Sequence, residues 1–321
     1  MPRIVVLDGL TLDPGDNPWD ELAALGDLEV HDRSADDEIV PRARGAEIVL
    51  TNKTHLSAES LARLPELRFV AVLATGYDVV DVAEAARRGV VVSNVPEYGT
   101  ESVAQHVLAL VLELASAVGE HAEAVRAGDW IRAPDFCFWR RSPIELAGLA
   151  FGVVGFGRIG RRVGELAHAL GMSVLASGRP GASPPDVPWR PFAWRTTAEV
   201  FAESDVVSLH APLGRGQERL VDRAVLATMK PSAFLINAAR GALVDEAALA
   251  DALERRVIAG AALDVVAHEP MLADNPLRTA RNCIITPHIA WATLAARRRL
   301  MQTAVGNVRA YLAGAPINVV S

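Results

Sequence analysis

The chain has few cysteines, no long apolar run and no excess of positive charge. Its 321 residues include only Cys137 and Cys283, which argues against a disulfide-bonded scaffold and suits a reducing cytosol. No apolar run approaches the roughly 18–20 residues that span a bilayer, and Asp8 comes too early for a secretory signal. A formal net charge of −7 argues against nucleic acid or an anionic membrane as the main partner. We therefore expect a cytoplasmic protein.

Short apolar runs alternate with helical patterns through both halves of the chain, which predicts α/β architecture with parallel sheets covered by helices. The length suggests about two domains. The first half has expected strands at 4–7, 28–30, 48–50, 69–72 and 90–92, and expected helices at 19–25, 57–64 and 81–88. The second half has expected strands at 151–154, 173–176, 206–209, 233–237, 259–263 and 283–286, the size of a doubly wound dinucleotide-binding sheet.

Three connecting segments stand out. A largely apolar helical pattern from Glu101 to about Arg126 is typical of a helix that bridges domains or lies in a subunit interface. The loop from Gly128 to Pro143 is rich in aromatic and arginine residues, and is either a packed loop or a surface covered by a partner subunit. Residues 180–191 are expected to form a loop, because their prolines prevent regular strand pairing. A last helix is expected at about 293–312.

Three glycines follow the strand at 151–154 with the spacing of a dinucleotide fingerprint. Gly155, Gly157 and Gly160 form G-x-G-x-x-G and lead into a helical pattern. The first glycine permits a tight turn, the second lets the backbone approach a pyrophosphate, and the third lets helix and strand pack closely. The start of the helix would then bind the phosphates. The alternative is a close-packed turn without a ligand.

Polar residues cluster where strands of the second half end. Ligands of open α/β sheets bind outside the carboxyl ends of the strands, and His210, Arg240, Asp264, Glu269 and His288 all follow such ends. Imidazole transfers protons at physiological pH, and a neighbouring carboxylate fixes its tautomer and favours the charged ring. Arginine offers planar donors for a carboxylate or a carbonyl oxygen. The alternative is that Glu269 caps a loop and His288 binds backbone.

The sequence resembles the D-isomer-specific 2-hydroxyacid dehydrogenases along nearly its whole length. The motifs that carry the resemblance, in the order of the family, are LATGYDVVD (73–81), NVPEYGTESVAQ (94–105), GFGRIG (155–160), NAARG (237–241), ALDVVAHEP (262–270) and TPHIAW (286–291). The resemblance implies two doubly wound, Rossmann-like domains with a cleft between them. Residues 1–98, completed by 292–321, would form the substrate-binding domain, and residues 99–291 the dinucleotide-binding domain. It also implies that two subunits pair through the 100–140 region.

The resemblance assigns roles to individual residues. Arg240 would bind the substrate and act as an electrophile, Glu269 would orient His288, and His288 would donate a proton. The backbone N–H groups of Thr75 and Gly76 would bind the substrate carboxylate. No metal ligand is expected. The residues expected to bind the cofactor are Gly155, Gly157, Arg158, Ile159, Gly160, Ser177, Gly178, Arg179, His210, Ala211, Pro212, Ala238, Asp264, His288 and Ala290.

Within the family, NKT (52–54), DFCFW (135–139) and TPHIAWAT (286–293) look most like glycerate dehydrogenases, also called hydroxypyruvate or glyoxylate reductases. This likeness implies reduction of glyoxylate or hydroxypyruvate to glycolate or D-glycerate. In relatives of that group a tryptophan of the neighbouring subunit approaches the substrate, and Trp139 is the candidate here; alternatively, Trp139 is a core residue of its loop. Formate dehydrogenases of this superfamily have glutamine at the carboxylate position, so Glu269 argues against that branch.

The cofactor-binding motif departs from the family pattern at one position. NAD-preferring members end the second strand with an acid that binds the ribose 2′-OH, but Gly178 stands there, within Ser177-Gly178-Arg179. Without that carboxylate, Arg179 could pair with a 2′-phosphate, so we expect NADP as the preferred cofactor, with NAD as the alternative. Arg179 could also simply point into solvent.

Two rival functions are compatible with the same sequence. A phosphoglycerate or 4-phosphoerythronate dehydrogenase would need further basic residues around a substrate phosphate, and Lys53, Arg132 or Arg140 could serve. Some transcriptional corepressors also resemble this family and retain the Arg240, Glu269 and His288 set, so a nucleotide-sensing binding protein is the second rival.

Overall fold

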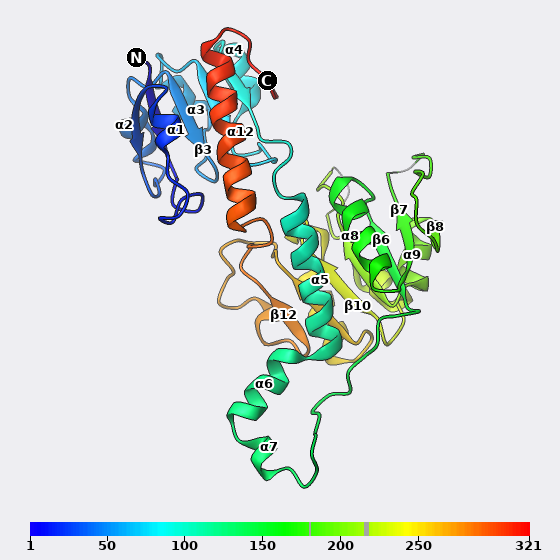
Figure 1. The fold of residues 1–321 in the computed structure, drawn as a ribbon. Coiled ribbons are helices and arrows are strands. Elements are labelled where there is room, and N and C mark those ends of the chain that lie inside the picture. The colour runs from blue at the N-terminus through cyan, green and yellow to red at the C-terminus, as the bar shows by residue number, and fades with distance from the viewer. Residues whose placement is uncertain (180, 215–217) are drawn as a thin grey trace. The chain divides into compact units, whose positions relative to one another are not determined.

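The structure, a computed structural model, describes residues 1–179, 181–214 and 218–321. It divides into two compact units, Met1–Gly99 with Ala292–Ser321, and Thr100–Trp291. Both units are built on parallel sheets with helices packed on them, so the predicted α/β class is confirmed (Figure 1).

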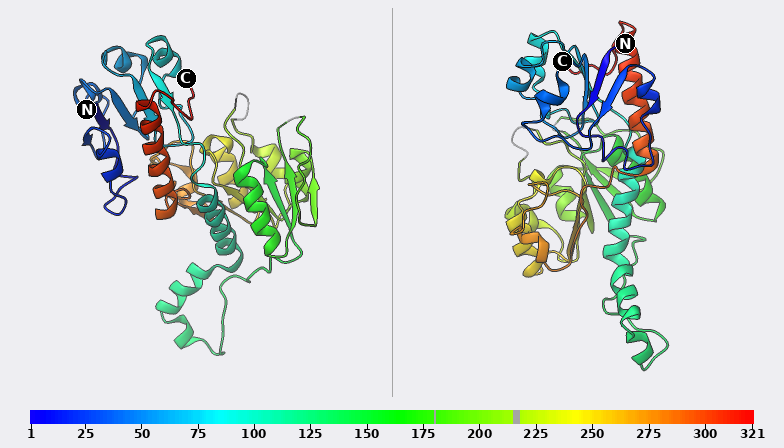
Figure 2. Two further views of the ribbon diagram at one scale, coloured as in Figure 1. Left: turned by 45° about the horizontal axis from the view of Figure 1, so that its top comes forward. Right: turned by 90° about the vertical axis from the view of Figure 1, so that its left-hand side faces the viewer.

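The first unit contains a five-stranded parallel sheet in the order β2-β1-β3-β4-β5. Its interior consists of valine, leucine and isoleucine from these strands and the helices against them. Figure 2 shows the sheet with α12 beside it. The elements are β1 (Arg3–Val6), α1 (Asp20–Ala23), β2 (Asp27–Val30), α2 (Ile39–Ala43), β3 (Ile48–Thr51), α3 (Ala58–Ala62), β4 (Phe69–Val72), α4 (Val82–Arg87), β5 (Val91–Ser93) and α12 (Leu294–Leu312).

Buried polar contacts attach the C-terminal helix α12 to this unit. Arg297 is 7% exposed, and its guanidinium donates hydrogen bonds to the Asp16 carboxylate at 2.5 and 2.7 Å and to the Leu12 carbonyl at 3.1 Å. The amide of the buried Asn307 donates to the Asn94 carbonyl at 2.9 Å. Tyr311 stacks on Phe69 of β4, with ring centroids 4.5 Å apart. The helix expected to return to the N-terminal strands therefore packs there through both charge and aromatic contacts.

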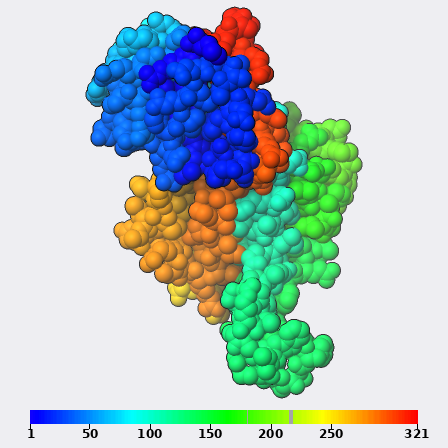
Figure 3. Space-filling view, turned by 60° about the vertical axis from the view of Figure 1, so that its left-hand side comes forward, coloured from blue at the N-terminus to red at the C-terminus, as the bar shows by residue number. Residues whose placement is uncertain are grey.

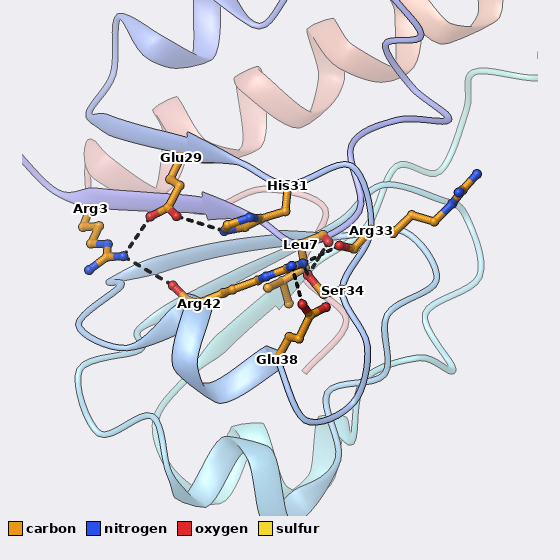
Figure 4. A network of polar contacts seen from close by, with 8 residues as sticks. All are labelled: Arg3, Leu7, Glu29, His31, Arg33, Ser34, Glu38 and Arg42. Atoms are coloured by element: carbon orange, nitrogen blue, oxygen red, sulfur yellow. Dashed lines mark hydrogen bonds and ion pairs between the residues drawn. The ribbon is translucent and has the colours of Figure 1, made fainter.

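A charged network joins the edge strand β2 to β1 and α2 (Figure 4). Arg3 pairs with Glu29 at 2.9 Å, and Glu29 also pairs with His31 at 3.1 Å. Arg42 of α2 donates to Glu38 at 2.7 Å and to the Ser34 hydroxyl at 2.8 Å. Most of these side chains are partly exposed, so the network stabilises the edge modestly.

The second unit contains a seven-stranded parallel sheet in the order β12-β11-β10-β9-β6-β7-β8. All strands are parallel, and the order of strands changes side at β6. The strands β7 and β8 lie on one side of β6, and β9 to β12 lie on the other. The elements are α5 (Thr100–Ser116), α6 (Val118–Arg126), α7 (Asp129–Arg132), β6 (Ala150–Val154), α8 (Arg158–Ala169), β7 (Ser173–Ser177), β8 (Phe192–Trp194), α9 (Thr197–Glu203), β9 (Val206–Leu209), α10 (Arg223–Thr228), β10 (Phe234–Asn237), η1 (Gly241–Leu243), α11 (Glu246–Glu254), β11 (Gly260–Leu263), η2 (Pro276–Thr279) and β12 (Cys283–Ile285).

The six strands expected in this unit are all present, and a seventh, β8, was not expected from the sequence pattern. This strand has only three residues and directly follows the loop 181–191, which has no regular structure, as expected; Pro180, where that loop was expected to begin, lies outside the described residues. The strand β8 pairs in parallel with β7, and in this register Trp194 lies opposite Ala176. Three residues are too few to give a strand pattern in sequence.

The prediction of a single helix from Glu101 to Arg126 is wrong, because the helix ends before Ala117 and a second helix begins after it. This residue adopts a left-handed conformation with φ +50°, and α5 and α6 meet there at a bend of 58°. The apolar side of α5 is buried against α8, β10 and β11 within the second unit, which accounts for its composition. Among the described residues no single helix is long and apolar enough to cross a membrane. The bent pair α5 and α6 has that length and composition only when the two helices are taken together.

Beyond the break, α6, α7 and the following chain form an arm, residues 117–145, that projects from the second unit (Figure 3). Large apolar side chains of the arm are exposed, among them Ile131 at 90% and Phe136 at 88%. The ring nitrogen of Trp130 donates to the Phe136 carbonyl at 3.0 Å, which orders the tip.

Candidate active site

The glycine loop after β6 has the geometry that dinucleotide binding requires. Gly155 has φ +95°, and a Cβ there would lie 2.6 Å from the Ala211 nitrogen. A Cβ on Gly160 would lie 2.2 Å from the Gly155 carbonyl oxygen, so helix and strand touch at that point. Around Gly157, in contrast, no described heavy atom beyond its own stretch of chain lies within 4 Å of a built Cβ. No side chain caps α8 at Gly157. A helix start without a side-chain cap, beside an open glycine, is suited to a pyrophosphate.

Two neighbouring strand ends complete this loop. The Ser177 carbonyl at the end of β7 accepts hydrogen bonds from the Gly155 and Phe156 nitrogens at 2.9 and 3.1 Å. The backbone N–H of His210, which follows β9, donates to the Val154 carbonyl at 2.7 Å. The His210 ring bonds the Ser208 hydroxyl at 2.8 Å, and burial lowers the pKa of His210 to about 4, so the ring is neutral at physiological pH. The predicted Ala211 and Pro212 come directly after it.

His288 and Glu269, which the strand-end pattern places at one edge of the sheet, are in direct contact. The Nδ1 atom of His288 lies 2.6 Å from a carboxylate oxygen of Glu269, and each side chain is about one-third exposed. The other carboxylate oxygen accepts a hydrogen bond from the Val266 nitrogen at 3.3 Å. His288 has φ +55°, a left-handed conformation that a side chain rarely adopts. Its Nε2 atom is the ring nitrogen that does not take part in this contact.

A buried carboxylate, that of Asp264, holds the loop that carries His288. One of its oxygens accepts from the Thr286 hydroxyl at 2.6 Å and the Ile289 nitrogen at 2.9 Å, and the other accepts from the Ala290 nitrogen at 2.8 Å. Asp264 is 1% exposed. Burial alone would raise the pKa of Asp264, but hydrogen bonds from His106 and the 286–290 loop outweigh it and hold the pKa below its usual value.

Arg240 follows β10 in a turn that backbone contacts define. The side chain of the buried Asn237 donates to the Arg240 carbonyl at 2.9 Å and accepts from the Ala239 nitrogen at 3.1 Å. A Cβ on Gly241 would lie 1.9 Å from the Val266 carbonyl carbon, so this turn packs directly on the chain that leads to Glu269. The guanidinium group itself is exposed. Arg240, Glu269 and His288 therefore follow three adjacent strands of one sheet, β10, β11 and β12.

Thr75 and Gly76 belong to the first unit, where they follow β4. The Thr75 hydroxyl donates to the Val95 carbonyl at 2.8 Å, and the Asn94 amide donates to the Thr75 carbonyl at 2.7 Å. Within the described residues the backbone N–H groups of Thr75 and Gly76 have no hydrogen-bond partner. Two adjacent unpaired amides at the end of a strand are suited to a carboxylate.

Comparison with known proteins identifies the family. Residues 108–290 match the NAD-binding domain of the D-isomer specific 2-hydroxyacid dehydrogenases. The chain is 45% identical over 322 residues to a hydroxypyruvate reductase of Blautia hydrogenotrophica, covering 99% of each chain. It is 42% identical over 286 residues to a glycerate dehydrogenase of Methylorubrum extorquens, covering 88% of each. The chain belongs to the D-isomer specific 2-hydroxyacid dehydrogenase family.

A solved structure of the same kind covers the whole chain. The NADPH-dependent glyoxylate/hydroxypyruvate reductase of Sinorhizobium meliloti, in complex with NADP and malonate, is 29% identical to it. The TM-score is 0.83, with 100% of this chain and 97% of the other covered. Family membership and the likeness to this group of reductases, both predicted from sequence motifs, are confirmed.

The aromatic loop and its Trp139 lie in the arm. Trp139 is 62% exposed, so the alternative that it is a core residue of its loop does not hold for this chain. Of the basic residues considered for a substrate phosphate, Arg132 and Arg140 both pair with Asp129, Arg132 at 2.6 Å. Lys53 is exposed.

The sequence did not predict the residues of α5 that contact Asp264 and the 286–290 loop. His106 of α5 lies 3.0 Å from the Thr286 hydroxyl and 3.4 Å from Asp264, and the Ser102 hydroxyl donates to the Ala290 carbonyl at 2.6 Å. The signal for them is two polar side chains in an otherwise apolar helix. In the part of the chain that the structure describes, no group of three or more His, Cys, Asp or Glu side chains could hold a metal ion.

Proposed function

We propose that the protein is a reductase of small 2-oxo acids that converts glyoxylate or hydroxypyruvate to glycolate or D-glycerate, with NADPH as preferred cofactor. The observation that carries the proposal is the 2.6 Å contact between His288 and Glu269, beside the Arg240 turn and on the same sheet as the glycine loop. The names of the relatives at 42% and 45% identity agree with it. The two cysteines, both free thiols, agree with a cytoplasmic setting.

Each residue of the proposed site has its own role in the reaction. When bound, the nicotinamide cofactor supplies the hydride for C2 of the substrate. The Arg240 guanidinium binds the substrate carboxylate and polarises the carbonyl oxygen through planar, permanently charged donors. The N–H groups of Thr75 and Gly76 offer a second set of donors for a carboxylate. His288 gives its Nε2 proton to the forming alkoxide, while Glu269 holds Nδ1 and stabilises the charged ring.

Initial-rate assays test this function directly. We expect fast reduction of glyoxylate and hydroxypyruvate with NADPH and slower reduction with NADH. Reduction that is faster with phosphorylated 2-oxo acids would replace the proposed substrate with that of a phosphoglycerate or 4-phosphoerythronate dehydrogenase. Binding of cofactor without turnover of any 2-oxo acid would favour the nucleotide-sensing role instead.

The preference for NADPH follows from charge at the end of β7. Position 178 has no carboxylate, and the exposed Arg179 has no acidic partner among the described residues. Unit charges 4 Å apart interact by about 4 kcal/mol at an effective dielectric of 20, and solvent reduces this for an exposed side chain. Each factor of ten in affinity needs about 1.4 kcal/mol, so an ion pair with the 2′-phosphate is sufficient for a clear preference.

We expect Arg179→Ala to weaken NADPH binding about tenfold and to leave NADH binding within about twofold, since NADH lacks the 2′-phosphate. Fluorescence titration of the free protein with each cofactor measures both constants. Arg195→Ala, an exposed arginine paired with Glu203, serves as the control. Equal weakening of both cofactors by Arg179→Ala would contradict the assignment.

We also propose that the protein is a homodimer paired through the arm. Exposed apolar patches on a protein surface mark sites of association, and Trp130, Ile131, Phe136 and Trp139 are all more than half exposed. Pairing of two arms would bury these side chains and would bring Trp139 to a second chain. This pairing agrees with the resemblance to relatives in which a partner's tryptophan approaches the substrate.

The double variant Ile131→Glu with Phe136→Glu is expected to be monomeric at micromolar concentration, because two charges would replace apolar contacts. Sedimentation velocity or light scattering after gel filtration measures the mass. Leu170→Glu, a similar change at an exposed leucine outside the arm, should leave the mass unchanged. A wild-type protein that is already monomeric would refute the pairing.

A further inference from the structure

The backbone conformation at position 178 does not require glycine. Its φ lies outside the left-handed region where glycine is favoured, unlike that of Gly155 at +95°. A residue with a side chain could therefore adopt the same backbone. A different constraint must keep position 178 free of a side chain.

That constraint is the indole ring of Trp194 on the neighbouring strand β8. A Cβ built on Gly178 would lie 2.8 Å from Cη2 and 2.9 Å from Cζ2 of Trp194. Carbon atoms in contact are normally 3.5–4.0 Å apart, so the ring occupies the space into which any side chain at this position would extend. The next atom, Cβ of Ala182, is 3.4 Å away and lies within ordinary contact.

The ring is held in this position by the strand and by an aromatic cluster. Trp194 lies opposite Ala176 in the pairing of β8 with β7, and the Arg195 nitrogen donates to the Ala176 carbonyl at 2.9 Å. Phe156, the residue between the first two glycines of the cofactor loop, meets the Trp194 ring edge-on at a centroid distance of 6.2 Å. The ring of Phe156 also packs near that of Phe192, with ring centroids 5.4 Å apart. A shift of the Trp194 ring would therefore disturb the cofactor loop itself.

We propose that Trp194 is a cofactor-specificity residue, because its ring excludes an acidic side chain from position 178. An acid at the end of this strand is what binds the ribose 2′-OH in NAD sites, and its carboxylate would repel a 2′-phosphate. The pair Gly178 and Trp194 thus keeps the ribose site open to NADPH, and a change at either residue alone does not create a tight site for NADH. This inference rests on the proposed NADPH-linked function.

The steric part of the inference is tested without any ligand. Gly178→Ala adds one methyl group and should lower Tm by about 5 °C in the wild-type background, the size of an overpacking effect. In a Trp194→Val background the same change should lower Tm by less than about 1 °C. Trp189→Val provides the matched control, because Trp189 belongs to the same aromatic cluster through Phe192 but packs on Gly164. Equal effects of Gly178→Ala in all three backgrounds would refute the exclusion.

Cofactor titration of the free protein tests the specificity part. Gly178→Asp alone should weaken NADPH binding about tenfold and gain little affinity for NADH, because the carboxylate and the ring cannot both occupy this space. Gly178→Asp with Trp194→Val should bind NADH at least tenfold more tightly than Gly178→Asp alone and should prefer NADH to NADPH. Gly178→Asp with Trp189→Val should behave like the single variant.

Two outcomes would overturn the proposal. Gly178→Asp alone could bind NADH as tightly as the Trp194 double variant, or the Trp189 double variant could gain the same affinity. Failure of the proposed function looks different, since a wild-type protein that reduces no 2-oxo acid would still show the Tm differences and the cofactor affinities of these variants.

Discussion

Replacing His288 with alanine is expected to lower kcat for glyoxylate reduction by about 10²–10⁴-fold, the range that a positioned general acid contributes. The dissociation constant for NADPH should stay within about twofold of the wild-type value. The reason is geometric: Glu269 binds Nδ1 of the ring at 2.6 Å, so Nε2 carries the proton that the alkoxide receives. Stopped-flow or steady-state assays with glyoxylate, and fluorescence titration with NADPH, measure the two quantities.

The backbone at position 288 calls for a second variant. His288 has φ +55°, and asparagine tolerates this conformation better than alanine does. His288→Asn therefore removes the imidazole with the least disturbance of the loop, and we expect the same loss of kcat. His268→Ala is the control, because that histidine is exposed and its ring lies 3.0 Å from the Pro270 carbonyl rather than on a carboxylate. Wild-type turnover in His288→Asn would remove the proton-donor role.

The cofactor loop could be predicted because each of its glycines meets a local requirement. A tight turn at Gly155, an open approach at Gly157 and a close contact at Gly160 all lie within six residues, and the spacing alone encodes them. The polar residues at strand ends could be predicted for a related reason, since parallel strands bring their carboxyl ends to one edge. Arg240, Glu269 and His288 follow three adjacent strands as that rule requires.

The support beneath the site could not be predicted, because it depends on contacts between distant segments. His106 meets Thr286 across 180 residues of sequence, and no local pattern encodes that contact. The break at Ala117 is similar: the residue has no helix-breaking side chain, and the chain turns where Gly119 can donate to the Glu113 carboxylate at 3.0 Å. Trp194 belongs to the same class, since its role becomes visible only when β8 is placed beside Gly178.

Asp264→Ala is expected to lower the free energy of unfolding by several kcal/mol and kcat by at least tenfold. The change would remove the acceptor of the Ile289 and Ala290 nitrogens and of the Thr286 hydroxyl. A buried donor left unpaired, as the Ala290 nitrogen would be, costs about 1–3 kcal/mol, and the two partly buried donors add to this loss. These three donors flank His288, so the loop that carries the proton donor would lose its position as well as its stability. Asp264→Asn should have a similar but smaller effect, because its amide places a donor where a carboxylate oxygen accepted.

The pH dependence separates this role from a general loss of packing. The pKa of Asp264 lies below its usual value in the folded protein, so the carboxylate stabilises the fold above the usual pKa of about 3.9. That contribution is lost as the pH falls through the lowered pKa. The difference in free energy of unfolding between wild type and Asp264→Asn should therefore be full at pH 7 and shrink below about pH 4.

Urea unfolding from pH 7 to pH 3, followed by tryptophan fluorescence, measures this difference. The control is Asp274→Asn, an exposed aspartate of the same unit, which should track the wild type at every pH. Assays of kcat well below the Tm of each variant separate a misplaced His288 from unfolded protein. Wild-type kcat in a destabilised Asp264→Asn would make Asp264 purely structural. Reduced kcat in a fully folded variant would mean that this carboxylate positions the proton donor through the backbone of the 286–290 loop.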